Sequence, residues 1–337
     1  MHQEEEMGKI EPVFLPWHNS LLQQLQSLKQ QSRLPHAILI DSKSEEDGSG
    51  FIWRLAMLLL CNEVTDLAPC GQCPACQLML SNTYPDFKYV TMEYDDKIKK
   101  MSKNIKIEQI RNVIHEVNLT NRYDNLKVIA IHPAEKMNLA SANSLLKTLE
   151  EPGSQVVMIL LTYNKGKLPV TIRSRCQSWS LARPVKPISQ SWLLDQGFEK
   201  EESEQYLEYA GGDPLLALKL RGLNYASLVD EFKQQFSLYL KGSIDVTALC
   251  SKLIKHEVSL IRRLIKMLIS AYCYRLSGLN SNFQLQDSGR KYQARDMIEL
   301  SGQAERQLMI EDNNLNLQIQ LEDVLISLKQ IIKRSTD

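Results

Sequence analysis

The sequence predicts an α/β fold with a mostly parallel sheet in the first part of the chain and an all-helical region in the last part. As far as about Trp179, short apolar runs alternate with segments of helical period, which is typical of buried parallel strands covered by helices on both faces. From Tyr225 to the end only helical periodicity remains, as at Leu260, Leu264 and Leu268. A chain of 337 residues suits two or three domains.

Each expected element follows from a local pattern. Leucines from Leu21 to Leu28 recur on one face, which predicts the first helix, and the uninterrupted apolar run 37–40 predicts the first buried strand. Three segments lack such a period and are expected to be a polar tail, a charged loop and a linker: 1–12, 93–103 and 184–187. The expected elements, in chain order, are helix 17–32, strand 37–40, helix 50–61, strand 87–92, helix 107–118, strand 127–131, helix 140–150, strand 156–162 and a small helical region to about residue 222.

The composition is that of a soluble globular protein, with 43% apolar and 24% charged residues. The 40 Lys and Arg balance the 40 Asp and Glu, so no overall field draws the chain onto nucleic acid. Any DNA contact therefore needs a local patch or a partner subunit. The apolar runs are far shorter than the roughly 20 residues of a membrane-spanning helix, and the acidic N-terminus lacks the pattern of a secretory signal. A cytoplasmic protein without membrane contact is expected.

Four cysteines in one short stretch predict a metal site. Cys61, Cys70, Cys73 and Cys76 follow the spacing C-x8-C-x2-C-x2-C, and each Cys-x2-Cys pair lets two thiolates reach one ion. Four sulfur ligands complete tetrahedral Zn²⁺ and leave no position for water, so a structural zinc is favoured over a catalytic one. The alternative is four free thiols in a reducing compartment. The remaining cysteines are expected to be buried thiols: Cys176, Cys250 and Cys273.

The segment after the first strand has the framework of a phosphate-binding loop but not its residues. Such a loop needs glycines whose backbone N–H groups wrap the phosphates, and a lysine that supplies positive charge. The loop Asp41–Ser49 contains no Gly-Lys-Ser/Thr, and Lys43 lies too early to match the motif. Glu45, Glu46 and Asp47 are expected at the phosphate position, where like charges repel a triphosphate.

The second nucleotide-binding element is also missing. An ATPase of this class places two acids after an apolar strand, one for Mg²⁺ and one that orients water. After Ile131 this chain has His132 and Pro133 instead. Two independent losses on one scaffold favour a nucleotide fold that has lost its site over a fold that never had one.

Three further segments are distinctive in their order along the chain: Leu-Pro-His-Ala at 34–37, Asn-Ser-Leu-Leu-Lys-Thr-Leu-Glu-Glu-Pro at 143–152 and Ser-Arg-Cys at 174–176. Together they resemble AAA+ clamp-loader subunits of bacterial DNA polymerase III. The four-cysteine spacing after the first helix is shared with the tau/gamma and delta-prime subunits of that family. The resemblance covers residues 15–222. It implies a RecA-like AAA+ core over 1–182 with a zinc insertion at 61–76, a helical lid over 183–224 and an all-α collar over 225–337.

The resemblance also implies a role for Arg175. In this family the arginine of Ser-Arg-Cys projects into the ATP site of the neighbouring subunit and stabilises charge on the transferred phosphoryl group. Ser174 and Cys176 would fix its backbone and its packing. Without the resemblance, Arg175 would be interpreted as a solvated surface cation. Arg173 is expected to be structural or to contact the neighbour.

Departures from the family pattern favour the delta-prime kind over tau/gamma, because tau/gamma subunits keep the phosphate loop and the paired acids. The lid motif around Gly212–Leu218 also has Leu216 where active subunits place an arginine. Thr162, at the sensor position, is expected to cap its strand.

The function that follows is a non-ATPase clamp-loader subunit with structural Zn²⁺ and no ATP of its own. The implied partners are the tau/gamma and delta subunits in a ring, with the beta sliding clamp as a further candidate, and primed DNA is reached through the complex. The polymerase holoenzyme, not this chain, would carry the DNA-directed DNA polymerase activity. Two alternatives stay open: an active tau/gamma-like ATPase, and a zinc-dependent DNA-binding adaptor.

Overall fold

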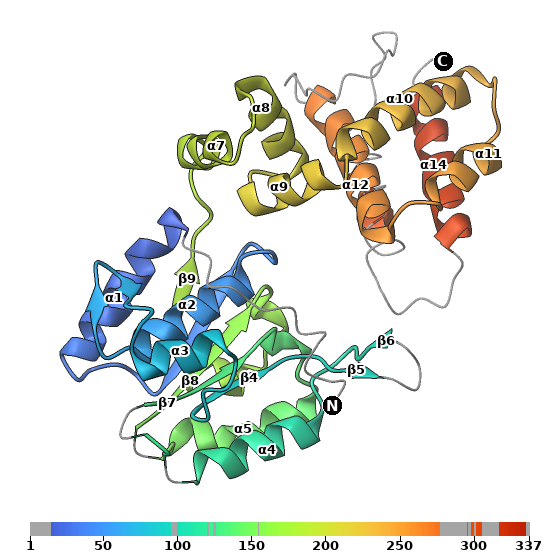
Figure 1. Cartoon of the computed structure of the whole chain (residues 1–337). Coiled ribbons are helices and arrows are strands. Elements are labelled where there is room, and N and C mark those ends of the chain that lie inside the picture. Colours follow the sequence, from blue (N-terminus) through green and yellow to red (C-terminus); the bar gives the residue numbers. More distant parts are fainter. Residues whose placement is uncertain are drawn as a thin grey trace. The chain divides into compact units, whose positions relative to one another are not determined.

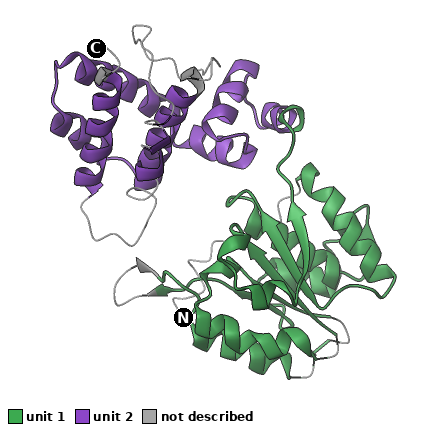
Figure 2. Cartoon of the chain, turned by 180° about the vertical axis from the view of Figure 1, so that it is seen from behind, with its two compact units in different colours: residues 1–188 green, residues 189–337 purple. Residues whose placement is uncertain are grey.

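A computed structural model describes residues 15–95, 100–119, 121–123, 126–153, 155–276, 295, 298–299, 301–304 and 317–334. The chain forms two compact units, residues 1–188 and 189–337 (Figure 2). The change of unit falls within a helix that begins at Lys186. The finer boundaries expected at residues 182 and 224 stay predictions. No helix in the described ranges is long and apolar enough to cross a membrane.

Unit 1 contains a five-stranded parallel sheet with the order β4-β7-β8-β1-β9 (Figure 1). Strand β1 therefore lies between β8 and β9, and the loop after β1 opens at the carboxyl edge of the sheet. The crevice at this edge is where open α/β folds bind their ligands. The strands are β1 (Ala37–Ser42), β4 (Phe87–Val90), β7 (Lys127–Ile131), β8 (Val156–Thr162) and β9 (Gln177–Leu181).

Helices cover both faces of this sheet, as the alternation of strands and helices predicts. Because successive side chains of a strand point to opposite faces, Val157, Ile159 and Leu161 of β8 join the core under α1, α2 and α3. Met158 and Leu160 join the core under α4 and α5, which lie side by side (Figure 1). The helices are α1 (Asn19–Gln30), α2 (Gly48–Leu60), α3 (Pro74–Leu80), α4 (Ile107–Val117), α5 (Leu139–Glu150) and α6 (Val170–Arg173).

Strand β9 was not among the expected elements. Of its residues only Leu181 is buried, because β9 is the edge strand next to β1 and pairs with it through the backbone. An edge strand of this kind has no apolar run for the pattern to detect. The cysteine-rich insertion contains a short ladder of β2 (Val64–Thr65) with β3 (Ala68–Pro69), and the expected charged loop contains one of β5 (Tyr94–Asp95) with β6 (Lys100–Met101).

Unit 2 is helical throughout its described residues, as the sequence predicts. Its core is rich in aromatic side chains, including Phe232 and Phe236, whose rings stack with centroids 5.5 Å apart. Leu264 and Leu268, two of the residues that indicated helical period, are fully buried. Helix α7 begins inside the expected linker 184–187. The helices are α7 (Lys186–Asp195), α8 (Lys200–Tyr209), α9 (Pro214–Gly222), α10 (Tyr225–Lys241), α11 (Val246–Leu253), α12 (Val258–Leu276) and α14 (Leu317–Arg334).

Candidate functional site

The loop Asp41–Ser49 connects β1 to the start of α2 and occupies the position of a phosphate-binding loop. Several of its polar groups form hydrogen bonds or ion pairs within the chain. The Ser42 hydroxyl donates to the Ser44 carbonyl (3.0 Å) and accepts from the Ser44 N–H (3.2 Å). The Lys43 ammonium pairs with Asp41 at 3.0 Å, and Arg183 Nε donates to the Lys43 carbonyl at 3.1 Å. The cation of this loop therefore pairs with a carboxylate of the same loop.

A buried carboxylate stands at the amino end of α2. Asp47 is 4% exposed, and it accepts hydrogen bonds from Trp17 Nε1 (3.0 Å) and His18 Nε2 (2.5 Å). The Asp47 carboxylate therefore bonds to Trp17 and His18 and does not cap the backbone N–H groups of α2. Glu45 and Glu46 are exposed, whereas Asp47 is buried. The expectation that these three acids occupy the phosphate position stays a prediction.

A hydrogen-bonded chain of side chains crosses the carboxyl edge of the sheet. The Tyr163 hydroxyl donates to the Glu45 carbonyl at 3.0 Å, so it accepts from His132 Nε2 at 2.5 Å. His132 Nδ1 is then the acceptor for the Tyr89 hydroxyl at 2.6 Å. Burial lowers the pKa of His132 to about 4. The imidazole is therefore neutral at physiological pH, as this order of donors and acceptors requires.

The linked side chains of His132 and Tyr163 lie beside the start of α2. A Cβ atom placed on Gly48 would lie 2.4 Å from Tyr163 Oη and 3.1 Å from His132 Nε2. Neither distance leaves room for a methyl group on Gly48 unless a neighbouring side chain moves. His132 and Tyr163 thus pack against the start of α2.

Glu135, an acid near the loop, accepts hydrogen bonds at the end of β8. Thr162 Oγ1 donates to Glu135 Oε2 at 2.7 Å, and the Tyr163 N–H donates to Glu135 Oε1 at 3.1 Å. Thr162 Oγ1 also accepts from the Asn164 N–H at 3.2 Å, which is the strand cap expected of Thr162. Glu135 therefore holds the strand end and its carboxylate is not directed at a metal site.

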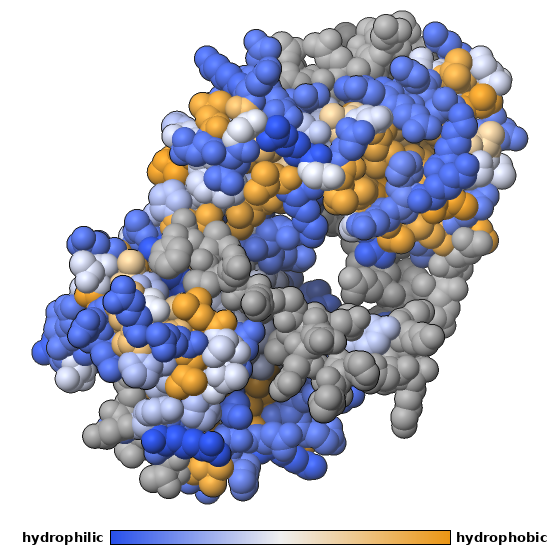
Figure 3. Space-filling model, in the orientation of Figure 1, coloured by the Kyte–Doolittle hydropathy of each residue, from blue (hydrophilic) through white to orange (hydrophobic). Residues whose placement is uncertain are grey.

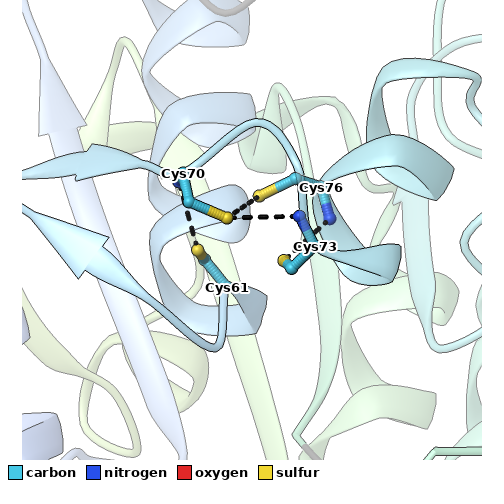
Figure 4. Close-up of side chains that lie close together, drawn as sticks. All are labelled: Cys61, Cys70, Cys73 and Cys76. Atoms are coloured by element: carbon cyan, nitrogen blue, oxygen red, sulfur yellow. Dashed lines mark hydrogen bonds between the residues drawn. The ribbon is translucent and has the colours of Figure 1, made fainter.

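The four clustered cysteines converge as the spacing predicts (Figure 4). Their Sγ atoms all lie within 4.8 Å of one another, and four sulfurs around a tetrahedral Zn²⁺ with bonds of about 2.3 Å would be about 3.8 Å apart. Backbone N–H groups of Cys70, Cys73 and Cys76 each donate to a cysteine sulfur, at 3.3, 3.3 and 3.5 Å. These residues fit a metal ion. Among the described residues this is the one cluster of potential ligands with such geometry.

The cysteines come from a helix end, a short ladder and a helix start. Cys61 caps α2, Cys70 follows the β2–β3 ladder, and Cys73 is the N-cap of α3. Burial alone would raise the pKa of Cys73. Hydrogen bonds from the backbone of Asn62 and Cys76 outweigh this effect and lower the pKa of Cys73 to about 6. Burial raises the pKa of the Cys76 thiol. A bound cation would offset that cost of ionising the buried thiol.

Arg175 lies on the surface between α6 and β9, with 31% of its side chain exposed. Its Nε and Nη2 both donate to Glu150 Oε1, Nε at 2.7 Å, and its Nη1 donates to the Thr171 carbonyl at 3.0 Å. Ser174 is exposed, whereas Cys176 is buried, and burial raises its pKa to about 11. In the segment Ser174–Cys176, the Cys176 side chain is thus buried, whereas the Ser174 and Arg175 side chains reach the surface.

Arg175 and the loop Asp41–Ser49 lie at opposite ends of the parallel strands, Arg175 at the amino end and the loop at the carboxyl end. Strands β1 and β9 are parallel, with Ile38 opposite Gln177 and Ser42 opposite Leu181. Arg175 therefore precedes the amino end of the sheet, whereas the loop follows its carboxyl end. Five residues of strand between these levels span about 17 Å. The guanidinium cannot serve the loop of its own chain.

The three segments that carry the family resemblance meet around Arg175. His36 Nε2 donates to the Leu149 carbonyl at 2.9 Å and so caps the last turn of α5, whose final residue, Glu150, pairs with Arg175. The sequence predicted the importance of each segment separately. It did not indicate the Glu150–Arg175 pair, nor the roles of Tyr89 and Tyr163, because no local pattern records contacts between distant elements.

Comparison with known proteins places the fold and the family. The family model described as DNA polymerase III, delta subunit, matches residues 17–184. A DNA polymerase III gamma subunit-related protein from Thermotoga maritima has the same fold, with a TM-score of 0.53 at 18% identity over 92% of this chain and 99% of that one.

Relatives with higher identity are delta′ subunits of DNA polymerase III. That of Pseudomonas aeruginosa is 33% identical over 209 residues, 61% of each chain. That of Escherichia coli is 31% identical over 206 residues, 61% of this chain and 60% of the relative. The chain thus aligns with less than two thirds of the length of these two proteins. The Haemophilus influenzae subunit is 30% identical over 227 residues, 67% of each chain. This chain belongs to the family of DNA polymerase III delta′ subunits.

Proposed function

We propose that this chain is a clamp-loader subunit that holds no ATP itself and supplies Arg175 to the ATP site of a neighbouring tau/gamma subunit. One observation carries the proposal. Arg175 is partly exposed at the amino end of the sheet, while the chain's own loop Asp41–Ser49 lies at the carboxyl end, where Asp47 is buried and Tyr163 bonds to the Glu45 carbonyl. A cation that cannot serve its own loop remains available to a second subunit.

The chemistry of arginine suits this role. Its guanidinium is planar, always charged and able to bind two phosphate oxygens at once. When such a group reaches a transferring phosphoryl group, it neutralises the charge that spreads over the equatorial oxygens, with an effect of about 10³–10⁵ in rate. The exposed Ser174 and the buried Cys176 would support the arm from either side.

The cysteine cluster would hold a structural Zn²⁺. Four sulfur ligands complete the coordination of the ion and leave no site for a reacting water. The insertion between α2 and α3 is too short to form a core of its own, so the ion would fix its fold. Zinc in this position supports the shape of unit 1 and takes no part in hydrolysis.

The expected partners are the tau/gamma and delta subunits, in a ring that places the sliding clamp on primed DNA. Unit 2 would act as the collar of the ring. Large apolar side chains are exposed on its described helices, and Figure 3 shows apolar surface there. Such side chains are the material of subunit interfaces. They are Leu194, Leu223, Leu238, Ile254, Val258, Ile298, Ile319 and Ile326.

The test is reconstitution of the ring with tau/gamma and delta, followed by DNA-stimulated ATP hydrolysis. Arg175→Ala should leave assembly intact and lower hydrolysis sharply, because one neighbouring site loses its trans cation. Arg33→Ala, at an exposed arginine of the same unit, is the control and should have no effect. Unchanged hydrolysis in the Arg175→Ala ring would remove Arg175 from the proposed role.

A further inference from the structure

All three nitrogens of the Arg175 guanidinium have partners within this chain. Nε and Nη2 converge on one carboxylate oxygen of Glu150, and Nη1 donates to the carbonyl of Thr171. Among the described residues, Glu150 is the carboxylate that pairs with Arg175. The arm is therefore held against α5, with its charge neutralised by an acid that is 51% exposed itself.

We propose that Glu150 is a positioning residue that restrains Arg175 until the phosphate oxygens of a docked neighbour replace its carboxylate. The proposal rests on the proposed function of Arg175 and adds a step to it. The guanidinium would exchange one anionic partner for another, so the unassembled chain keeps its reactive cation paired. Glu150 would then reduce the engagement of Arg175 with nucleotide and would not itself touch the nucleotide.

A hydrogen bond from His36 holds the helix turn that carries Glu150. Glu150 is the last residue of α5, and His36 Nε2 binds the carbonyl of the preceding residue, Leu149, at 2.9 Å. The carboxyl end of a helix carries a partial negative charge. Arg175 therefore faces two sources of negative potential, the end of α5 and the carboxylate, both held by the same capped turn.

The strength of this restraint suits exchange. Both side chains are partly exposed, at 31% and 51%, and an exposed ion pair changes an equilibrium by at most about fivefold. Salt weakens it further. A triphosphate carries several negative charges and can displace a single carboxylate. The restraint is therefore measurable, and it does not prevent the arm from reaching a neighbour.

Whether Glu150→Gln raises or lowers ATP hydrolysis shows if Glu150 restrains Arg175 or supports it. Glu150→Gln keeps the shape and an acceptor oxygen for Arg175 but removes the competing charge. If Glu150 restrains the arm, the variant engages nucleotide more readily. If Glu150 instead holds the arm in its working orientation, removal of the charge weakens that hold, and hydrolysis falls as it does in Arg175→Ala.

The experiment uses the reconstituted ring of this chain with tau/gamma and delta at subsaturating ATP. The measured quantity is the Arg175-dependent hydrolysis, taken as the rate minus that of the Arg175→Ala ring. Glu150→Gln should raise this quantity about two- to fivefold at low salt, with a smaller rise at high salt. Glu151→Gln is the matched control, because Glu151 is the next residue, is exposed and does not contact Arg175.

The double variant Glu150→Gln with Arg175→Ala should hydrolyse ATP no faster than Arg175→Ala alone, which a general structural effect of Glu150 would not produce. An unchanged or lower rate in Glu150→Gln overturns the restraint while leaving the role of Arg175 intact. If Arg175→Ala itself has no effect, the proposed function fails first. Gel filtration of each ring confirms that the variants assemble.

Discussion

The hydroxyl of Tyr163 donates a 3.0 Å hydrogen bond to the carbonyl of Glu45, and this contact joins the end of strand β8 to the loop that follows β1. In a nucleotide-binding protein, bound phosphate would link these elements. Here a phenol does so, backed by His132. The loop is therefore held by contacts within this chain.

Tyr163→Phe tests this contact. The substitution removes the donor to the exposed Glu45 carbonyl and the acceptor for His132 Nε2, so one buried polar group, on His132, loses its partner. An unpaired buried group of this kind costs about 1–3 kcal/mol. The amide of Ser44 should exchange its hydrogen faster, and the melting temperature of unit 1 should fall. Tyr94→Phe, at a tyrosine that is 45% exposed, is the control. Unaltered exchange in the loop would mean that Tyr163 does not hold it.

The buried His132 predicts a pH dependence. Its pKa is lowered to about 4 by burial, whereas an unfolded chain has a histidine pKa near 6.5. Between these values the unfolded state binds a proton that the folded state does not, so the free energy of unfolding falls as the pH drops from 6.5 towards 4. The slope approaches about 1.4 kcal/mol per pH unit for this group.

His132→Asn separates this contribution from that of other groups. The variant should be less stable at pH 7, because Tyr89 and Tyr163 lose their shared partner. Since asparagine does not titrate, the gap between wild type and variant should narrow as the pH falls below 6.5. Denaturant unfolding at several pH values measures it. Parallel stability curves would show that His132 titrates normally in the folded chain.

The sequence predicted the parts of the fold that have a repeating local pattern. Buried parallel strands such as β8 are uninterrupted apolar runs, and the helix of unit 2 around Leu264 has a clear period. Strand β9 was not predicted, because an edge strand with one buried residue is held by backbone hydrogen bonds. Such bonds produce no pattern of apolar and polar side chains in the sequence.

The candidate site divides in the same way. The cysteine spacing predicted a cluster, because ligands close in sequence must converge around a tight turn. The loss of phosphate-loop residues was evident in Asp41–Ser49, but what fills the space was not. Tyr163 follows a strand end that no motif marks, and its partner Glu45 is 118 residues away. The same holds for Glu150 and Arg175, which are 25 residues apart.

The cysteine cluster predicts that metal removal loosens the insertion and leaves the rest of the chain folded. Metal analysis should find about one zinc per chain, since four sulfurs complete one tetrahedral ion. A chelator, or Cys73→Ser, should increase proteolysis between Cys61 and Cys76 without abolishing ring assembly. Cys273→Ser, outside the cluster, should do neither. Equal cleavage with and without chelator would exclude a structural metal there.

Arg175→Lys asks whether charge alone is enough. Lysine keeps the positive charge but presents a single ammonium, which cannot bind two phosphate oxygens side by side. It would also lose the two-nitrogen contact that Arg175 makes with Glu150. In the reconstituted ring, Arg175→Lys should therefore keep less than about one tenth of the Arg175-dependent hydrolysis, since trans arginines contribute about 10³–10⁵ in rate. A lysine variant with near-wild-type hydrolysis would show that Arg175 acts as a distant charge and not as a group that grips the phosphoryl oxygens.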